Sequence, residues 1–356
     1  MLQKVSVLVP TRNEEPNIRQ CLDSLLKQDY EGEVEILVVD GMSTDRTVDV
    51  VREVAAHHPN VRLLKNPKRT VTAALNIGIP EAEGEFIARG DAHALYESDY
   101  ISQCVKHIND TGAANVGGVM NQLPETTFFG SIARALHESR FGIGAAKFHR
   151  GGHTGWVDTV WPGFYRREVF DRVGLYREKL TRSEDIELNR RLHAAGFRIY
   201  MSPEIKAHYR PRNTLKGLLA QNFGNGRAIS QTIFVSPGAI SLRHLVPGTF
   251  VTVACIFLAM LCCPIAGISS LAWVPIALLA AAYGLAGVWF SASSAVENGN
   301  AMLLPALMVV FPLLHVTYGL GTLWGLVSEG PKAIIERVKH GCSKEPKQPY
   351  LHPTRA

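Results

Sequence analysis

Charged side chains are missing from two long stretches of this 356-residue chain. Neither Asp, Glu, Lys nor Arg occurs in residues 244–296 or in residues 298–328. A helix on the surface of a soluble protein needs a polar face, so stretches of this length are not ordinary core helices. They predict membrane spans at about 247–268, 271–292 and 302–327, each near the twenty residues that a bilayer requires.

Signals for secretion and for disulfides are also missing. The N-terminal apolar run is too short for a signal peptide and has no small-residue cleavage site, so we expect the first domain to remain in the cytosol. The six cysteines form no C-x-x-C pair. We interpret Cys21, Cys104, Cys255, Cys262 and Cys263 as small buried apolar groups, and not as disulfides or zinc ligands.

The net charge of +5 is too small to indicate a nucleic-acid partner, but basic residues gather on both sides of the uncharged stretches. They are Arg210, Arg212, Lys216, Arg227 and Arg243 before them, and Lys332, Arg337, Lys339, Lys344 and Lys347 after them. Such clusters suit an anionic cytosolic leaflet, and the alternative for the second cluster, which is less favoured, is a solvated charged tail. The segment 212–243 is also amphipathic, which favours a position on the bilayer surface.

The number of spans conflicts with this charge distribution. With a cytosolic first domain, three spans place the basic tail outside, against the tendency of basic segments to stay in the cytosol. Either one apolar segment is re-entrant or interfacial, or the tail breaks the rule.

Before residue 210, predicted strands and helices alternate. Apolar strands are expected at 5–10, 35–40, 61–64 and 85–88, with helices between them. This alternation is typical of βαβ units and a parallel sheet, in which functional groups gather beyond the C-terminal ends of the strands. Asn13, Asp40 and Asp91 each follow a predicted strand end, so we expect them to cluster.

The segment Arg89-Gly-Asp-Ala-His93 directly follows the fourth of these strands. In an extended segment, Asp91 and His93 place their side chains on the same side. A carboxylate with an imidazole suits Mn²⁺ or Mg²⁺, and such an ion can bridge two phosphate oxygens and stabilise a leaving diphosphate. An isolated match of this kind fits a capped turn equally well.

Asp40 opens a second polar segment, Asp40-Gly-Met-Ser-Thr-Asp45, at the end of the second strand. A carboxylate in this position can accept a hydrogen bond from a base N–H or a ribose hydroxyl, and the position favours ligand binding for Asp40. Ser43 and Asp45 equally fit as caps of the next helix.

Two adjacent carboxylates, Glu184 and Asp185, stand at the start of a predicted helix that ends near residue 195. A carboxylate in an acceptor pocket can deprotonate an attacking hydroxyl. The alternative is that both side chains only complement the helix dipole, which is the more common role of a lone Glu-Asp pair.

Taken in order, these segments resemble family 2 glycosyltransferases of the GT-A fold. The resemblance rests on residues 9–14 (Val-Pro-Thr-Arg-Asn-Glu), 39–47, 76–78 (Asn-Ile-Gly), 91–93, 163–167, and 183–192 with Gly196. It covers roughly residues 5–209. The Asp-Ala-His-Ala variant, residues 157–160 (Val-Asp-Thr-Val) and the apolar C-terminal spans look closest to succinoglycan-type exopolysaccharide glucosyltransferases, which build lipid-linked oligosaccharides.

The resemblance implies an α/β fold, namely a Rossmann-like GT-A domain of the nucleotide-diphospho-sugar transferase type followed by transmembrane helices. It implies that Asp185 is the catalytic base, with Glu184 beside it. It also implies a divalent metal, Mn²⁺ or Mg²⁺, held by Asp91, His93 and, as a third ligand, His208. The residues implied to bind the donor are Pro10, Thr11, Asn13, Glu14, Asp40, Ser43, Asn76 and Asp91.

The implied reaction is an inverting transfer of a sugar, expected to be glucose from a UDP-sugar, to a polyprenyl-diphosphate-linked saccharide. It takes place at the cytosolic face of a bacterial-type cytoplasmic membrane, with other polysaccharide-assembly enzymes as expected partners. The expected organisation is a GT-A domain at 1–210, an amphipathic juxtamembrane segment at 211–245, about three transmembrane helices at 246–328 and a basic tail at 329–356.

Two departures from the family pattern keep alternatives open. The second aspartate of the usual D-x-D is His93, so the metal preference is open. The Q-x-x-R-W motif of processive synthases is absent, since residues 221–227 read Gln-Asn-Phe-Gly-Asn-Gly-Arg. The alternatives are transfer to polyprenyl phosphate, a processive polysaccharide synthase, a catalytically inactive binding module, and a transporter. The last is disfavoured because the spans carry no charge, only His315.

Overall fold

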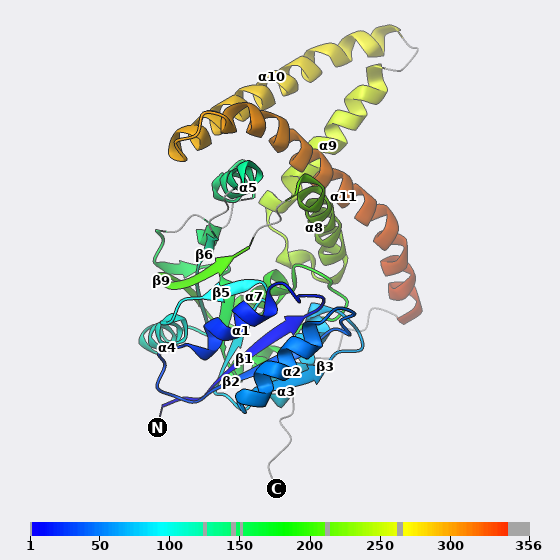
Figure 1. Ribbon diagram of the computed structural model, residues 1–356. Helices are drawn as coiled ribbons and strands as arrows, with labels where there is room; N and C mark the ends of the chain where they lie inside the picture. Colours follow the sequence, from blue (N-terminus) through cyan, green and yellow to red (C-terminus); the bar gives the residue numbers. More distant parts are fainter. Residues whose placement is uncertain are drawn as a thin grey trace. The chain divides into compact units, whose positions relative to one another are not determined.

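The computed structural model describes residues 2–123, 127–143, 147–149, 152–210, 214–261 and 266–340, without the side chains of 261, 266–272 and 332–340. It forms two compact units (Figure 1). The first contains Met1–Leu123, Ala146–Arg210 and Ser343–Ala356, and the second contains Pro124–Ala145 and Pro211–Cys342. The second unit thus includes a segment from the middle of the predicted GT-A domain. Several positions discussed above lie outside the described residues or side chains: Arg212, Cys262, Cys263, Lys332, Arg337, Lys339, Lys344 and Lys347.

The first unit is built on a mixed sheet whose described strands have the order β3-β2-β1-β4-β8-β6-β9-β5, with β7 also paired to β9. β1 runs parallel to both β2 and β4, and β2 runs parallel to β3. The antiparallel β8 joins this parallel half to β6. The strands are β1 (Val5–Thr11), β2 (Val34–Asp40), β3 (Val61–Lys65), β4 (Phe86–Arg89), β5 (Ala94–Tyr96), β6 (Asn115–Gln122), β7 (Gly155–Val157), β8 (Trp161–Arg166) and β9 (Ile199–Tyr209).

Helices cover both faces of this sheet. One face carries α1 (Ile18–Leu26), α2 (Thr47–His57) and α4 (Tyr100–Thr111), and the other carries α3 (Val71–Glu81), α6 (Glu168–Val173) and α7 (Glu184–Ala194). In β1, Val7 packs in the first core and Leu8 in the second. The strand is therefore buried on both sides, which explains why it is apolar on both faces and not alternately apolar and polar. The short 3₁₀ helix η1 spans Lys147–His149.

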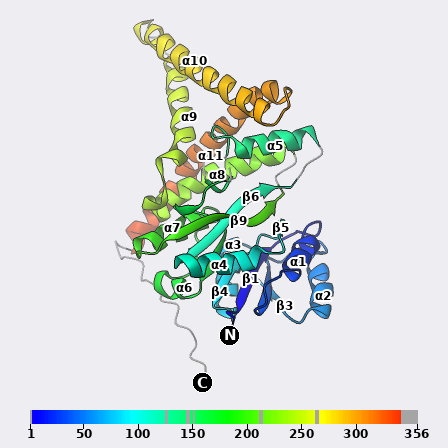
Figure 2. The ribbon, with the colours of Figure 1, turned by 90° about the vertical axis from the view of Figure 1, so that its left-hand side faces the viewer.

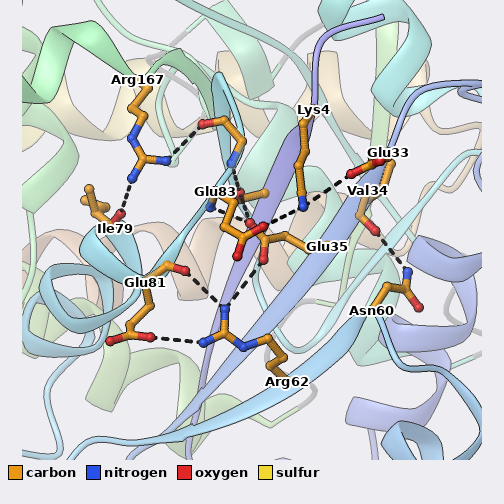
Figure 3. Close-up of polar contacts among 12 residues, drawn as sticks. Lys4, Glu33, Val34, Glu35, Asn60, Arg62, Ile79, Glu81, Glu83 and Arg167 are labelled. Atoms are coloured by element: carbon orange, nitrogen blue, oxygen red, sulfur yellow. Dashed lines mark hydrogen bonds and ion pairs between the residues drawn. The ribbon is translucent and has the colours of Figure 1, made fainter. Parts of the chain in front are cut away.

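A buried carboxylate joins the strands where the parallel half of the sheet begins. Oε1 of Glu35 accepts hydrogen bonds from the Ser6 hydroxyl and from the Glu83 backbone N–H, both at 2.5 Å, and a guanidinium nitrogen of Arg62 lies 3.7 Å from Oε2. The Gly84 N–H donates to the Ser6 hydroxyl at 2.7 Å. Figure 3 shows Glu35 between Glu83 and Arg62. The turn that precedes β4 is thus held against β1 and β2.

The second unit is helical. Its described elements are α5 (Phe128–Glu138), α8 (Leu215–Val235), the 3₁₀ helix η2 (Pro237–Ala239), α9 (Leu242–Leu261), α10 (Ala266–Glu297) and α11 (Leu303–His340). Three helices are long and apolar enough to cross a membrane, over Leu242–Met260, Trp273–Glu297 and Leu303–Pro331. This confirms the prediction of three apolar C-terminal helices.

The described cysteines differ in their surroundings. Cys21 and Cys104 are buried free thiols, as expected. Cys255 is exposed, so the interpretation of this residue as a buried group was wrong. The reason is that α9 is apolar around its whole circumference, and the face that carries Cys255 is not covered by protein.

Candidate active site

One arginine connects the two ends of the predicted site. Arg89, the last residue of β4, donates from Nη1 to both carboxylate oxygens of Asp185, at 2.5 and 2.6 Å, and to Oε1 of Glu184 at 2.8 Å. Its Nε donates to Oδ1 of Asp91 at 3.3 Å. The structure therefore brings Asp91 together with the Glu184–Asp185 pair, although 92 residues lie between Asp91 and Glu184 in the sequence.

A buried ion-pair network holds the first turn of α7, which presents Glu184 and Asp185. Glu187 is fully buried and lies 2.8 Å from both Arg177 and Arg191. Arg191 also donates to the carbonyl oxygens of residues 173, 174 and 175. Because an unpaired buried charge is costly, this pairing strongly favours one position of α7 relative to the preceding loop.

Asp91 is held as a carboxylate. Its Oδ2 accepts a hydrogen bond from the indole N–H of Trp161 at 2.8 Å, and its backbone N–H donates to the Tyr96 hydroxyl at 2.8 Å. Burial opposes ionisation, but Arg89, His93 and the Trp161 hydrogen bond together lower the pKa of Asp91 below its usual value. An ionised carboxylate at this position is what binding of a divalent cation requires.

The pKa of Asp185 is shifted in the opposite direction to that of Asp91. Burial, together with the negative charges of Glu184 and Asp91, raises the pKa of Asp185 to about 7, against the attraction of Arg89. The physical reason is that three carboxylates share a single guanidinium, so the group retains an excess of negative charge. A carboxylate with a pKa near neutrality has the proton affinity of an effective general base.

The loops after β1 and β2 are joined by hydrogen bonds. Thr11 and Asp40 are partners in the parallel register. The Ser43 hydroxyl donates to Oδ1 of Asp40 at 2.5 Å and accepts the Asn13 backbone N–H at 2.9 Å. Oδ1 of Asn13 accepts the Thr44 N–H at 2.8 Å. Asn13 has a φ of 54°, a left-handed conformation that Asn tolerates, and this directs its side chain toward the second loop.

Two further predicted donor-binding residues, Pro10 and Glu14, lie within the same strands and loops. Pro10 is half-buried in β1, and Glu14 follows the Asn13 turn. The Glu14 backbone N–H donates to the Thr47 hydroxyl at 2.8 Å. Its side chain reaches the segment after β4, because Oε1 of Glu14 lies 3.2 Å from Nδ1 of His93. The donor-side loop is therefore in contact with the predicted metal-binding segment.

Asp45 and Asn76 have local structural contacts. Asp45 accepts the backbone N–H and the hydroxyl of Thr47 at the start of α2, which fits its expected capping role. The side-chain amide of Asn76 donates to the Tyr176 carbonyl at 2.8 Å and accepts the Tyr176 N–H at 2.9 Å. Asn76 thus supports the loop that leads to α7.

His208 points away from the other two predicted metal ligands. It pairs with Leu95 in the β5–β9 register, and its Nε2 lies 2.6 Å from Oε1 of Glu97. The next residue, Tyr209, has the opposite orientation and contacts the rings of His93 and Trp161. Within the described residues, no group of three or more His, Cys, Asp or Glu side chains is arranged as a metal site.

The donor chemistry around Asp91 nevertheless fits a divalent ion. Asp91 supplies an ionised carboxylate, His93 an imidazole two residues away, and Glu14 a second carboxylate in contact with that imidazole. The Asp91, Glu184 and Asp185 carboxylates outnumber the single cation of Arg89, so a bound cation would compensate local negative charge. Oxygen and nitrogen ligands of this kind suit Mn²⁺ or Mg²⁺.

Sequence reasoning did not assign roles to three residues of this site: Arg89, Trp161 and Glu187. Arg89 stands in the quoted Arg-Gly-Asp-Ala-His segment, and a cation directly before a metal-type pair was a usable signal. Trp161 and Glu187 gave no such signal, because only the folded sheet brings Trp161 to Asp91 and only the packed loop pairs Glu187 with Arg177.

The fold is that of a GT-A-type transferase, and comparison with known proteins identifies the family. Residues 6–174 match the family model described as glycosyl transferase family 2. The chain is 32% identical over 318 residues to succinoglycan biosynthesis protein ExoA of Rhizobium meliloti, covering 88% of this chain and 92% of that protein. The chain therefore belongs to glycosyltransferase family 2 and is a glycosyltransferase.

Two further relatives extend the comparison. A dolichyl N-acetyl-α-D-glucosaminyl phosphate 3-β-D-2,3-diacetamido-2,3-dideoxy-β-D-glucuronosyltransferase of Methanococcus voltae is 30% identical over 255 residues, which cover 69% of this chain and 78% of that protein. Among solved structures, a mannosyltransferase from Pyrobaculum calidifontis in complex with GDP-Man and Mn²⁺ superposes with a TM-score of 0.55 at 21% identity, over 91% of this chain and 88% of that one. This structural likeness supports the fold.

Proposed function

We propose that this glycosyltransferase transfers a sugar, with inversion, from a nucleotide-diphosphate donor to a lipid-linked saccharide at a membrane surface. The observation that carries the proposal is the position of Arg89, which contacts Asp91 on one side and Asp185 on the other. A diphosphate-binding carboxylate and a general base must act on the two sides of one reacting carbon, and Arg89 holds these two groups in one site.

The donor side is assigned to the loops after β1, β2 and β4. Asp40 is available for the base or ribose, with Ser43 beside it, and Thr11, Asn13 and Glu14 line the adjacent strand end. Asp91 and His93 would hold a divalent cation, Mn²⁺ or Mg²⁺, which when bound neutralises charge on the departing diphosphate. His208 remains a predicted third ligand, and its contact with Glu97 would have to break for that role.

The acceptor side is assigned to Asp185. Its carboxylate removes the proton of the acceptor hydroxyl while that oxygen attacks the anomeric carbon and the bond to the diphosphate breaks. Arg89 orients this carboxylate through two hydrogen bonds and keeps part of its charge compensated before the proton arrives. Glu184, on the same guanidinium, is placed to contact the acceptor.

The relatives and the apolar helices support the proposed acceptor class. One relative is named for succinoglycan biosynthesis and another for action on a dolichyl-linked saccharide phosphate. With three helices that could span a membrane, a polyprenyl-diphosphate saccharide at the cytosolic face of a bacterial-type cytoplasmic membrane fits this chain, with glucose from a UDP-sugar as the first donor to test. Transfer to polyprenyl phosphate and processive synthesis are the competing reactions, and other assembly enzymes are candidate partners.

The proposal is tested with purified protein in lipid vesicles, a panel of nucleotide sugars, and two acceptors, polyprenyl phosphate and a polyprenyl-diphosphate saccharide. We expect one nucleotide sugar to be consumed with the second acceptor, one sugar to be added per acceptor, and NMR to show the opposite anomeric configuration in the product. A ladder of long products would instead favour a processive synthase. Retained configuration would refute the single displacement by Asp185.

A further inference from the structure

The three apolar helices are not equivalent within the second unit. α9 and α10 are covered by protein along only 11% of their most apolar windows, but α11 is covered along 33%. Figure 2 shows α5 and α8 beside α11, whereas much of α9 and α10 projects away from these helices as a hairpin. Of the three candidate spans in the described residues, α11 is thus the one that other helices cover most.

α8 runs parallel to α11 and packs against most of the apolar segment Leu303–Pro331. The side chain of Asn222 donates to the Leu314 carbonyl at 2.7 Å, the Ser230 hydroxyl donates to the Thr322 carbonyl at 2.7 Å, and Arg227 pairs with Glu329 at 2.8 Å. The axes come very close, since a Cβ added at Gly321 would lie 2.2 Å from the carbonyl oxygen of Phe223. Because α8 is packed this closely, a position of α11 inside the bilayer would place α8 in the bilayer as well.

The composition of α8 is incompatible with crossing hydrocarbon. Its 21 residues include two cations and four amide side chains, namely Lys216, Gln221, Asn222, Asn225, Arg227 and Gln231. Arg227 keeps 45% of its side-chain surface exposed despite its ion pair. A charged side chain at the centre of a bilayer is costly, so a membrane-crossing α8 would be strongly disfavoured.

α5 also packs against α11, near the first part of that helix. Ile132, Ala135 and Leu136 pack in one core with Leu307 and Phe311. On its outer side, α5 carries the exposed pair Arg134–Glu138. Nε2 of His315 donates to the Phe141 carbonyl at 2.7 Å, which fixes the end of this segment to α11. Charged residues thus stand beside both halves of the apolar window.

The uncovered face of α11 is entirely apolar. Its exposed residues recur with helical spacing and include Val309, Leu313, Val316, Leu320, Trp324 and Val327. α11 therefore has one apolar face and one face that is covered by helices with charged residues. A helix that lies in the membrane interface has these two properties. A spanning helix with the same sequence would carry α8 into the bilayer with it.

From these observations we propose that α11 lies along the membrane surface with α5 and α8, and that only the α9–α10 hairpin enters the bilayer. The surface formed by Val309, Val316 and Val327 then faces the lipid hydrocarbon, while Arg227 and Arg134 lie at headgroup level. This arrangement returns the chain to the side from which it entered. It also removes the charge conflict, because the basic residues after 331 then remain on the same side as the first unit.

The proposal is tested by measuring the depth of spin labels in mixed phosphatidylcholine and phosphatidylglycerol vesicles. Single cysteines replace Val309, Val316 and Val327 in a full-length cysteine-free variant. Positions 309 and 327 are about 27 Å apart along a helix, nearly a bilayer thickness. We expect three similar, shallow depths. A deep position 316 between shallow ends would show that α11 crosses, and would overturn the proposal.

The matched control is α10, with cysteines at Val274, Leu285 and Val296, which are also exposed. There we expect Leu285 to be deeper than both flanking positions. Equal, shallow depths in α10 would also contradict the proposal, because the hairpin would then not enter the bilayer.

A second measurement does not need the cysteine-free variant to fold well in vitro. A membrane-impermeant maleimide is applied to intact and permeabilised cells that carry either Cys342 or a cysteine at Glu31 of the first unit as the single reporter. Labelling of both only after permeabilisation supports the proposal, and labelling of Cys342 in intact cells overturns it. Neither measurement uses catalysis, so the result is independent of the proposed sugar transfer.

Discussion

Replacement of Arg89 tests the electrostatic core of the site. In Arg89→Gln, the Asp91, Glu184 and Asp185 carboxylates lose the single cation that they share. Two unit charges about 4 Å apart interact by about 4 kcal/mol at the effective dielectric of a protein surface, and about 1.36 kcal/mol corresponds to one pKa unit. Asp185 keeps 28% of its side-chain surface exposed, so solvent reduces the expected rise in its pKa to about 1–2 units.

A higher pKa of Asp185 lowers the activity at neutral pH, because less of the base is ionised. Burial already raises the pKa of Asp185 to about 7, so about half of the base is ionised at pH 7. A rise of about 1–2 units lowers the ionised fraction to between about 1 and 10%, and kcat/KM at pH 7 falls about 5- to 50-fold. The acidic limb of the pH profile moves to higher pH by the same amount, and activity recovers at about pH 9.

The measurement is kcat/KM for sugar transfer from pH 5.5 to pH 9.5. Arg89→Lys keeps the charge but cannot contact Asp91 and Asp185 from two separate nitrogens, so we expect a smaller shift of the acidic limb. The control is Arg52→Gln, which removes an exposed arginine whose nearest carboxylate is 3.9 Å away, and which should leave the profile unchanged. An Arg89→Gln profile with an unshifted acidic limb would refute the reasoning, even if the activity fell.

Three further predictions concern stability. Glu35→Gln replaces the charged acceptor of two short hydrogen bonds and should destabilise the first unit by about 1.5–3 kcal/mol. The measurement is the apparent melting temperature, which should fall. An unchanged melting temperature would contradict a structural role for this network. Glu187→Gln leaves two arginines without their buried partner, so we expect a loss of about 3–5 kcal/mol, and a wild-type melting temperature would argue against the α7 network. Gly321→Ala should separate α8 from α11 and cost about 1–3 kcal/mol, whereas the control Gly284→Ala, which has open space around its added Cβ, should behave as wild type.

Most of the catalytic fold was predictable because its signals are local and repeated. The strands β1 and β2 are mostly apolar apart from Ser6 and Glu35, since helices cover both faces of the sheet, and this pattern is visible without any tertiary information. The sequence signal for β9 is weaker, because Glu204, Lys206 and His208 interrupt the apolar pattern of this strand. These residues face the side of β9 on which His208 meets Glu97 and Glu204 meets His107.

The candidate site was partly predictable for a different reason. The carboxyl ends of parallel strands meet at one sheet edge, so the joining of the Asn13 and Asp40 loops follows from topology. The contact of Arg89 with Asp185 depends on the exact placement of α7, which is set by Glu187 and Arg191. No spacing in the sequence encodes such a contact between distant segments.

The helical unit shows the limit of hydropathy. Leu303–Pro331 is at least as apolar as the other two candidate spans, yet it is the one most covered by protein. Hydropathy alone cannot separate a face that packs on protein from one that meets lipid, and only the contacts of Asn222, Ser230 and Arg227 with α11 reveal the difference.

The most direct test of the central claim measures donor binding and sugar transfer separately in Asp185→Asn and Asp91→Asn. The account predicts that Asp185→Asn binds the nucleotide sugar as the wild type does but transfers it at least about 100-fold more slowly. It predicts that Asp91→Asn loses metal-dependent donor binding. Near-normal turnover by Asp185→Asn would show that another group accepts the proton, and would contradict the account.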